Sequence, residues 1–273
     1  MSIIAISRGT RGGGLELADR LAERLGYRTL SREVVVAESA EKFNVMEEFL
    51  QVKLDKTPSL WQKFTNDYRR YICFIQCALL DAVKQDNVIY HGHAGQFLLK
   101  GLPSVLKLRI EAPLEYRVRA VMSELSYDRD QAVQYIERVD DERKRWVKMV
   151  YGQDWCDPSL YDMCVNLQNM SMGSICDVVA MLVDNDDFRT SEDSISRLND
   201  AALQCSVEAI LSADDRIWNS GHQVSVTAHN GMVSLRGTTR TDELRDLIVE
   251  TTSRVEGVIG CKSGIHLLSD TLR

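Results

Sequence analysis

Two patterns of hydrophobic residues take turns along the first 185 residues of the chain. Short apolar runs rich in β-branched residues are typical of buried strands. They predict strands at Ile3–Ile6, Tyr27–Leu30, Asn87–His91, Val105–Ala112 and Cys176–Val183. Between these runs, apolar residues recur every three or four positions, which predicts helices. The predicted helices are Leu15–Leu25, Arg32–Lys42, Leu60–Lys84, Leu114–Leu125 and Arg129–Val150.

This alternation of strands and helices predicts an α/β fold with a doubly wound parallel sheet. Ligands of such sheets bind at the carboxyl ends of the strands. The segments expected at that edge are Ser7–Gly14, Gly92–Gly95 and Ala112–Pro113. Residues 45–58 fit neither pattern, and Thr57-Pro58 would end any helix there.

The pattern changes at Asp184, where a polar and acidic run begins. We therefore predict two domains, residues 1–184 and 198–270, joined by an acidic linker at 185–197. The second domain is predicted as a small αββαβ unit, in which Asn230-Gly231 is a strong hairpin signal. Its predicted elements are Leu198–Ala213, Gln223–Ala228, Met232–Thr238, Thr241–Val255 and Ile259–Leu268.

Composition narrows the class of protein. The formal net charge is −7, whereas dedicated nucleic-acid binders usually carry an excess of basic residues. The seven cysteines form no CxxC pair, so reduced, mostly buried thiols are expected. The chain shows no cleavable leader pattern and no apolar run near the roughly 18 residues that span a bilayer. These features predict a cytoplasmic protein.

A glycine-rich turn follows the first predicted strand and leads straight into the first predicted helix. Glycines let backbone N–H groups crowd an anion, and a helix N-terminus adds partial positive charge. The sequence therefore predicts a phosphate cradle, flanked by Arg8. The predicted cradle residues are Thr10, Arg11, Gly12, Gly13 and Gly14. The alternative is a tight turn that needs its glycines for geometry alone.

Residues 1–185 resemble the cytidylate kinase-like family, a branch of the nucleoside monophosphate kinases. The resemblance rests on three groups of residues. They are Ser7-Arg8 with Glu16-Leu17-Ala18; Gly92, Leu98-Leu99, Pro103 and Ala112–Arg117; and Asp140–Arg143, Gly152, Trp155, Asp157-Pro158, Tyr161-Asp162 and Asn166. The resemblance implies a P-loop kinase-like fold that uses ATP and Mg²⁺. It also implies transfer of the ATP γ-phosphoryl to a nucleoside monophosphate such as CMP.

The resemblance also implies roles for particular residues. Arg8, Arg138, Asp140 and Arg143 would be catalytic, the last three from a helix that covers the transferred phosphoryl. Arg117 would contact the donor phosphates. The residues implied for the acceptor nucleotide are Ser31, Arg32 and His93. By spacing alone, residues 138–145 also fit a solvated helix face of i, i+4 ion pairs.

The chain lacks the lysine of a P-loop, as the resembled family also tends to, and it departs from the family pattern itself at other positions. Gly14 stands where a P-loop has lysine, Arg11 where the family has its first loop glycine, and Leu15 where a basic residue often follows. His93 stands where the family usually has arginine. These departures support an alternative: a catalytically degraded nucleotide-binding pseudokinase that acts as a sensor or scaffold. The pair His91 and His93 lacks the partners of a metal site, so we predict no metal ligands in the chain.

Residues 198–268 resemble a BON domain. The matching residues are Val224–Val226, Asn230-Gly231, Val233–Leu235, Gly237 and Val255–Val258. The resemblance implies a binding module for a small ligand, a membrane surface or a protein partner.

Overall fold

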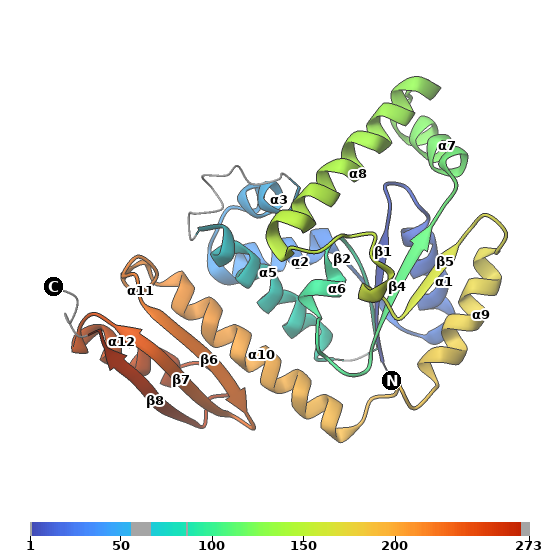
Figure 1. The fold of residues 1–273 in the computed structure, drawn as a ribbon. Coiled ribbons are helices and arrows are strands. Elements are labelled where there is room, and N and C mark those ends of the chain that lie inside the picture. The colour runs from blue at the N-terminus through green and yellow to red at the C-terminus, as the bar shows by residue number, and fades with distance from the viewer. Residues whose placement is uncertain (1, 56–66, 86, 269–273) are drawn as a thin grey trace.

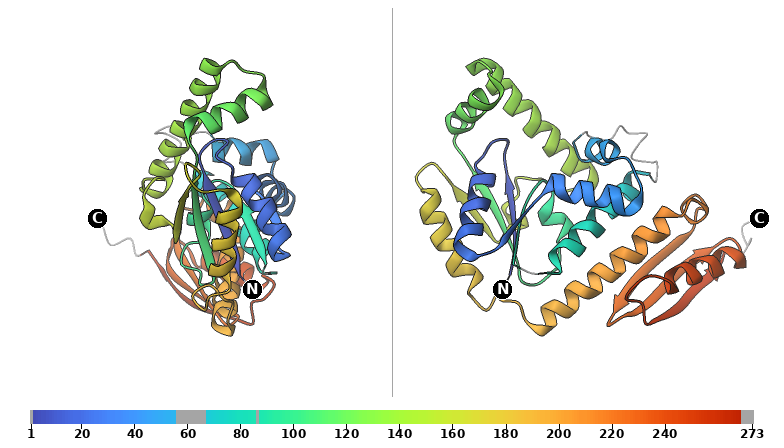
Figure 2. Two further views of the ribbon diagram at one scale, coloured as in Figure 1. Left: turned by 90° about the vertical axis from the view of Figure 1, so that its right-hand side faces the viewer. Right: turned by 180° about the vertical axis from the view of Figure 1, so that it is seen from behind.

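The structure is a computed structural model that describes residues 2–55, 67–85 and 87–268 (Figure 1). The first part of the chain folds around a five-stranded sheet, and the last part around a three-stranded sheet. A long helix, α10, lies between the two sheets (Figures 1 and 2).

The five-stranded sheet has the order β2-β3-β1-β4-β5, and every neighbouring pair is parallel. Its strands are β1 (Ile3–Arg8), β2 (Arg28–Ser31), β3 (Val88–His91), β4 (Val105–Glu111) and β5 (Met163–Asn166). The order places β1 in the centre, so its carboxyl end opens between β3 and β4. The parallel sheet predicted from the sequence is confirmed.

Helices cover both faces of this sheet, and a separate apolar core lies under each face. Helices α1 and α9 pack on the face formed by Ile4, Ile6 and Leu108. Helices α2 and α5 pack on the opposite face. The helices of this part are α1 (Gly14–Leu25), α2 (Arg32–Phe43), α3 (Glu47–Asp55), α5 (Asp67–Val83), α6 (Gly95–Leu98), α7 (Leu114–Leu125), α8 (Arg129–Tyr151), α9 (Met172–Val183) and the 3₁₀ turn η1 (Pro158–Leu160).

One predicted strand is wrong. The run Cys176–Val183 belongs to helix α9, and the fifth strand is the shorter β5. Ser171 caps α9 by accepting a hydrogen bond from the Ser174 N–H at 3.1 Å. The buried residues of α9 then follow helical spacing along one face, from Ile175 to Val179 to Val183. In this run, the cap and the spacing outweigh the β-branched composition.

Two other differences concern the helices before β3. Helix α3 occupies most of the segment for which the sequence predicted no element. Helix α5 confirms the described part of the predicted helix Leu60–Lys84. The predicted start at Leu60 and the break at Thr57-Pro58 lie outside the described residues.

The C-terminal part contains a three-stranded sheet of order β6-β7-β8. Strands β6 and β7 are antiparallel, and β7 and β8 are parallel. Asn230 and Gly231 turn the hairpin with positive φ angles of 47° and 78°, as predicted. The elements are α10 (Glu192–Ala213), α11 (Asp215–Trp218), β6 (Gln223–His229), β7 (Met232–Thr239), α12 (Asp242–Ser253) and β8 (Gly260–Leu267).

Helix α10 belongs to both parts of the molecule. It begins at Glu192, inside the predicted linker, because Ser191 and Ser194 form a capping box. Its small residues Ala202, Cys205 and Ala209 are buried in the core that contains α5. Its larger residues, such as Leu203 and Val207, are buried under the three-stranded sheet. The two sheets are therefore held on opposite sides of one helix.

Two further findings bear on the expectations from composition. All seven cysteines are free thiols. Among the described residues, no helix is both long and apolar enough to cross a membrane.

Candidate functional site

The glycine loop joins the end of β1 to the start of α1. The Gly12 N–H donates to the Gly9 carbonyl at 3.0 Å, which closes the turn. Gly13 is the N-cap of α1 and has a φ of 81°, a conformation that favours glycine. No side chain caps this helix end, so its N–H groups can bind an anion.

A cavity of about 430 Å³ opens at this helix end. Its lining combines the loop with residues at the carboxyl ends of β1 and β3, where a parallel sheet binds its ligands. The charged and glycine residues of the lining, with His91, are Arg8, Arg11, Gly13, Gly14, Glu16, Glu33, His91 and Glu124. The cavity is large enough for a chain of phosphate groups.

Asp140 fixes helix α8 to the glycine loop. Its carboxylate accepts hydrogen bonds from the Thr10 N–H at 2.8 Å and from the Thr10 hydroxyl at 2.7 Å. Arg117 forms an ion pair with the same carboxylate and donates to the Thr10 carbonyl at 2.8 Å. Arg143 donates to the Thr10 hydroxyl at 3.4 Å. Three predicted site residues of α7 and α8 therefore meet at the loop.

His93 lies buried beside this group and is only 6% exposed. Its ring packs against Trp146 and Trp155, with centroid separations of 5.0 and 5.8 Å. Burial lowers the pKa of His93 well below its usual value, and the charges of Arg143, Arg32 and Arg8 lower it further. The buried Nε2 atom has no hydrogen-bond partner among the described residues.

The Arg8 side chain lies across the start of α1. A Cβ atom added at Gly14 would lie 2.0 Å from Arg8 Cδ. Burial lowers the pKa of Arg8, while the nearby Glu33 carboxylate opposes that shift. Arg8 thus directs a positive charge into the cavity at the helix end.

Other predicted site residues have different surroundings. Ser31 caps α2 by accepting a hydrogen bond from the Val34 N–H at 3.3 Å. Arg32 pairs at 3.3 Å with Glu33, which lines the cavity. Arg11 is exposed and pairs with Glu124 at 2.5 Å.

Arg138 is the predicted catalytic residue that the structure does not bring to the loop. It is exposed, and its guanidinium lies over the ring of Tyr135, 5.8 Å from the ring centroid. This surrounding matches the solvated helix face that the spacing alone allowed.

A buried polar network under the loop was not predicted. Arg109 of β4 is 5% exposed, pairs with Glu111 and donates to the Trp155 carbonyl at 3.0 Å. The Trp155 indole donates to the Ser7 hydroxyl at 3.0 Å. The only signal in the sequence is a basic residue inside the apolar strand of β4. The Tyr161 hydroxyl joins this network by donating to the Trp155 carbonyl at 2.9 Å.

The residues near the loop do not offer a ready Mg²⁺ site. A P-loop serine or threonine hydroxyl holds the ion, but the hydroxyls of Ser7 and Thr10 are both bonded to side chains. No cluster of three or more His, Cys, Asp or Glu side chains that could hold a metal occurs in the described residues. The residues present therefore do not fit a resident metal ion.

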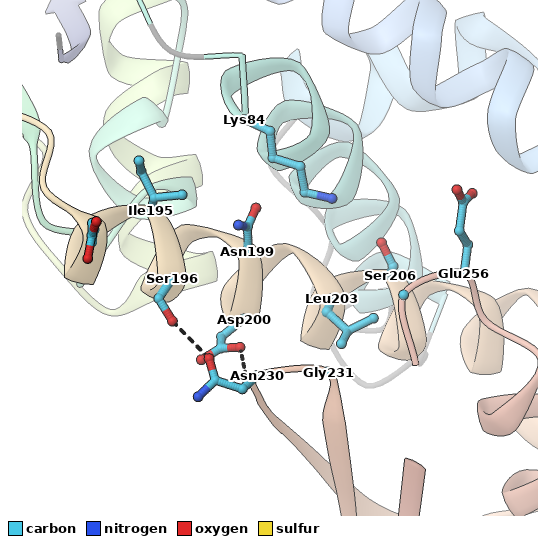
Figure 3. Close-up of a pocket in the computed structure, with 12 residues that line it drawn as sticks. Lys84, Ile195, Ser196, Asn199, Asp200, Leu203, Ser206, Asn230, Gly231 and Glu256 are labelled. Atoms are coloured by element: carbon cyan, nitrogen blue, oxygen red, sulfur yellow. Dashed lines mark hydrogen bonds between the residues drawn. The ribbon is translucent and has the colours of Figure 1, made fainter. Parts of the chain in front are cut away.

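A second cavity, of about 570 Å³, lies between α10 and the C-terminal sheet (Figure 3). Three of its polar lining residues, Ser196, Asp200 and Asn230, bond to one another. Asp200 accepts from the Asn230 N–H at 2.6 Å, and the Ser196 hydroxyl donates to the Asn230 side chain at 3.1 Å. These bonds hold the β6–β7 hairpin on α10, so the groups have a structural role.

Comparison with known proteins relates both parts of the chain to families. The sequence model of the cytidylate kinase-like family matches residues 3–169. The model of the BON domain matches residues 199–267.

Curated relatives named cytidylate kinase match the same first part of the chain. The protein from Methanocaldococcus jannaschii is 25% identical over 177 residues, covering 63% of this chain and 92% of the relative. The one from Sulfolobus acidocaldarius is 28% identical over 178 residues, covering 64% and 91%. A solved structure from Eubacterium ventriosum, described as an uncharacterized protein, is similar with a TM-score of 0.54 and 17% identity. It covers 67% of this chain and 98% of its own, and supports the fold alone.

Proposed function

Because the chain belongs to the cytidylate kinase-like family, we propose that it transfers the γ-phosphoryl of ATP to a nucleoside monophosphate. CMP is the first acceptor to test. The reaction would convert ATP and CMP to ADP and CDP. We propose the cytoplasm as its location and the BON domain as a module that binds a ligand, a membrane surface or a partner.

The convergence of three arginines on the buried His93 is the observation that carries this proposal. Arg8, Arg32 and Arg143 all act electrostatically on the buried His93. Arg8 also lines the cavity at the uncapped end of α1, where the helix adds partial positive charge. Phosphoryl transfer depends mainly on positioning and on neutralising charge, and this cluster can supply both.

On the donor side, the N–H groups of Arg11, Gly13 and Gly14 and the Arg8 guanidinium would hold the ATP phosphates. The N–H groups of Thr10 and Gly12 are already bonded, to the Asp140 carboxylate and the Gly9 carbonyl. Asp140 and Arg117 would fix helix α8 over the loop, as their bonds to Thr10 support. Arg143 would then lie near the transferred phosphoryl. Mg²⁺ would enter bound to ATP, since the chain's own hydroxyls near the loop are bonded to side chains.

On the acceptor side, Arg32 and His93 would bind the monophosphate. The His93 Nε2 atom is buried and without a partner among the described residues, which costs free energy unless a ligand satisfies it. Depending on its tautomer, this nitrogen can donate a hydrogen bond to a phosphate oxygen. Ser31, which caps α2, would fix the start of the acceptor-binding helix.

The test is an assay of the purified full-length chain with ATP, Mg²⁺ and a panel of nucleoside monophosphates. The proposal predicts formation of the matching diphosphate, with CMP or a related pyrimidine preferred. Binding of ATP without turnover for any acceptor would contradict the kinase proposal.

A second candidate is a nucleotide-binding pseudokinase that acts through the BON domain. One observation favours it. The Thr10 N–H, at the start of the proposed cradle, is already bonded to the Asp140 carboxylate. ATP binding without turnover would support this candidate, and absence of both would contradict the two proposals together.

A further inference from the structure

The glycine loop exchanges two residues relative to the P-loop signature. That signature places glycine six residues before its lysine, with a second glycine just before the lysine. In this chain Arg8 stands at the first of these positions, Gly13 at the second glycine, and Gly14 at the lysine. A cation and a glycine have therefore changed places at the two ends of the loop.

The structure brings these two positions together. A Cβ atom at Gly14 would lie 2.0 Å from Arg8 Cδ and 2.9 Å from Arg8 Nε. A real side chain at residue 14 could not occupy that space while Arg8 keeps its position. Gly14 is thus required by the path of the Arg8 side chain.

Arg8 also differs from its neighbours in its charge pairing. Arg117 pairs with Asp140, and Arg32 pairs with Glu33. Within the residues that the structure describes, the Arg8 guanidinium forms no hydrogen bond or ion pair. A partly buried charge without a bonded counterion is costly, and the Glu33 carboxylate offsets part of that cost without bonding to Arg8. The Arg8 side chain lines the cavity at an uncapped helix end. Both features favour an anion at that place.

We propose that Arg8 supplies, from the end of β1, the phosphate-binding charge that a P-loop lysine supplies from the start of its helix. Gly14 is the complementary residue, because its missing side chain admits the Arg8 stem. This inference rests on the proposed function, since it assumes that the cavity binds the phosphates of ATP. If Arg8 supplies this charge, the absence of a P-loop lysine is compatible with activity. That absence is otherwise the simplest argument that the chain is a pseudokinase.

The experiment reverses the exchange of residues between positions 8 and 14. Arg8→Gly removes the charge, and Arg8→Gly combined with Gly14→Lys restores the order of the P-loop signature. Calorimetric titration with ATP measures binding to the wild type and both variants. Arg24→Ala, at the exposed far end of α1, serves as a charge-matched control. Melting temperatures without nucleotide verify that each variant folds.

We expect Arg8→Gly to weaken ATP binding about 10- to 100-fold, the range for loss of a hydrogen bond to a charged group. The double variant should recover at least half of that loss on a logarithmic scale. Arg8→Lys, which keeps the charge, should bind ATP more tightly than Arg8→Gly. The Arg24→Ala control should bind as the wild type does.

Two results would overturn the inference while leaving the proposed function intact. One is equal ATP binding by the wild type and a folded Arg8→Gly variant. The other is a folded double variant that binds no better than Arg8→Gly. If the wild type itself binds no ATP, the proposed function fails instead.

Discussion

The arginines around the five-stranded sheet differ in their contacts from those around the three-stranded sheet. Beside the five-stranded sheet, Arg8, Arg32 and Arg143 converge on the buried His93, and Arg8 also lines the cavity at the start of α1. Around the three-stranded sheet, arginines at the surface pair with carboxylates that lie within four residues of them in the sequence. These pairs are Arg216–Asp214, Arg245–Asp242, Arg245–Asp246 and Arg254–Glu250.

The difference shows that counting basic residues does not locate an anion site. Surface ion pairs neutralise their own charge and contribute little free energy. Cations that share a cavity with a helix N-terminus concentrate positive potential there. The chain has a negative net charge, so only the geometry separates arginines of surface ion pairs from arginines that can bind an anion.

The largest expected effect comes from removing one converging arginine. Arg143→Ala should lower turnover about 100- to 1,000-fold, because it removes charge stabilisation at the transferred phosphoryl. Arg245→Ala, which removes a surface pair of the C-terminal part, should change turnover by less than about twofold. Initial-rate assays with ATP and CMP measure both. Equal effects of the two substitutions would erase the distinction between the two regions.

A smaller effect is expected at the helix that joins the two regions. Ala209 is fully buried in the core that α10 forms with α5. Ala209→Leu should lower the free energy of unfolding by about 1–3 kcal/mol through overpacking. Asn199→Leu, at an exposed position of the same helix, should change it by about 0.5 kcal/mol or less.

Urea denaturation followed by tryptophan fluorescence and by far-UV circular dichroism makes this measurement. Because α10 contributes to the cores under both sheets, both probes should report one transition at the same urea concentration. Two separate transitions would show that the regions unfold independently.

The smallest effect concerns the pH dependence of stability. Burial and the neighbouring arginines depress the pKa of His93 in the folded state, so the unfolded state binds the proton more readily. Stability should therefore fall as the pH drops below about 6.5, the usual pKa of histidine. His93→Phe keeps a ring between the two tryptophans and should flatten this slope.

The change in slope should be at most about 1.4 kcal/mol per pH unit, the limit for one titrating group. Denaturation curves at several pH values measure the slope. His266→Phe, at an exposed position of β8, is the matched control. A slope that is the same in the wild type and in His93→Phe would contradict the assigned role of this buried ring.

Local signals in the sequence predicted much of the fold. The glycine loop, the strands β1 to β4 and the Asn230-Gly231 hairpin each depend on neighbouring residues, so they could be recognised. The fifth strand was missed because Met163–Asn166 is short, with only Val165 buried, and a longer apolar run follows it in the sequence. Its longer apolar neighbour had the composition of a strand but the cap and spacing of a helix.

The residues of the candidate site could be predicted, but the contacts between them could not. The sequence and the family resemblance indicated Asp140, Arg143 and Arg117, while their meeting at Thr10 depends on how α7 and α8 fold back over the loop. The network of Arg109 and Trp155 joins residues 46 positions apart. No periodicity along the chain records such contacts.

The proposed function requires that the glycine loop and the buried His93 with its neighbouring arginines bind the two ends of one phosphate chain. Calorimetric titration with an adenosine–cytidine pentaphosphate tests it directly, because this molecule links a donor and an acceptor nucleotide through one phosphate chain. We expect one molecule to bind per chain, at least about tenfold more tightly than ATP binds alone. Binding no tighter than that of ATP would contradict it.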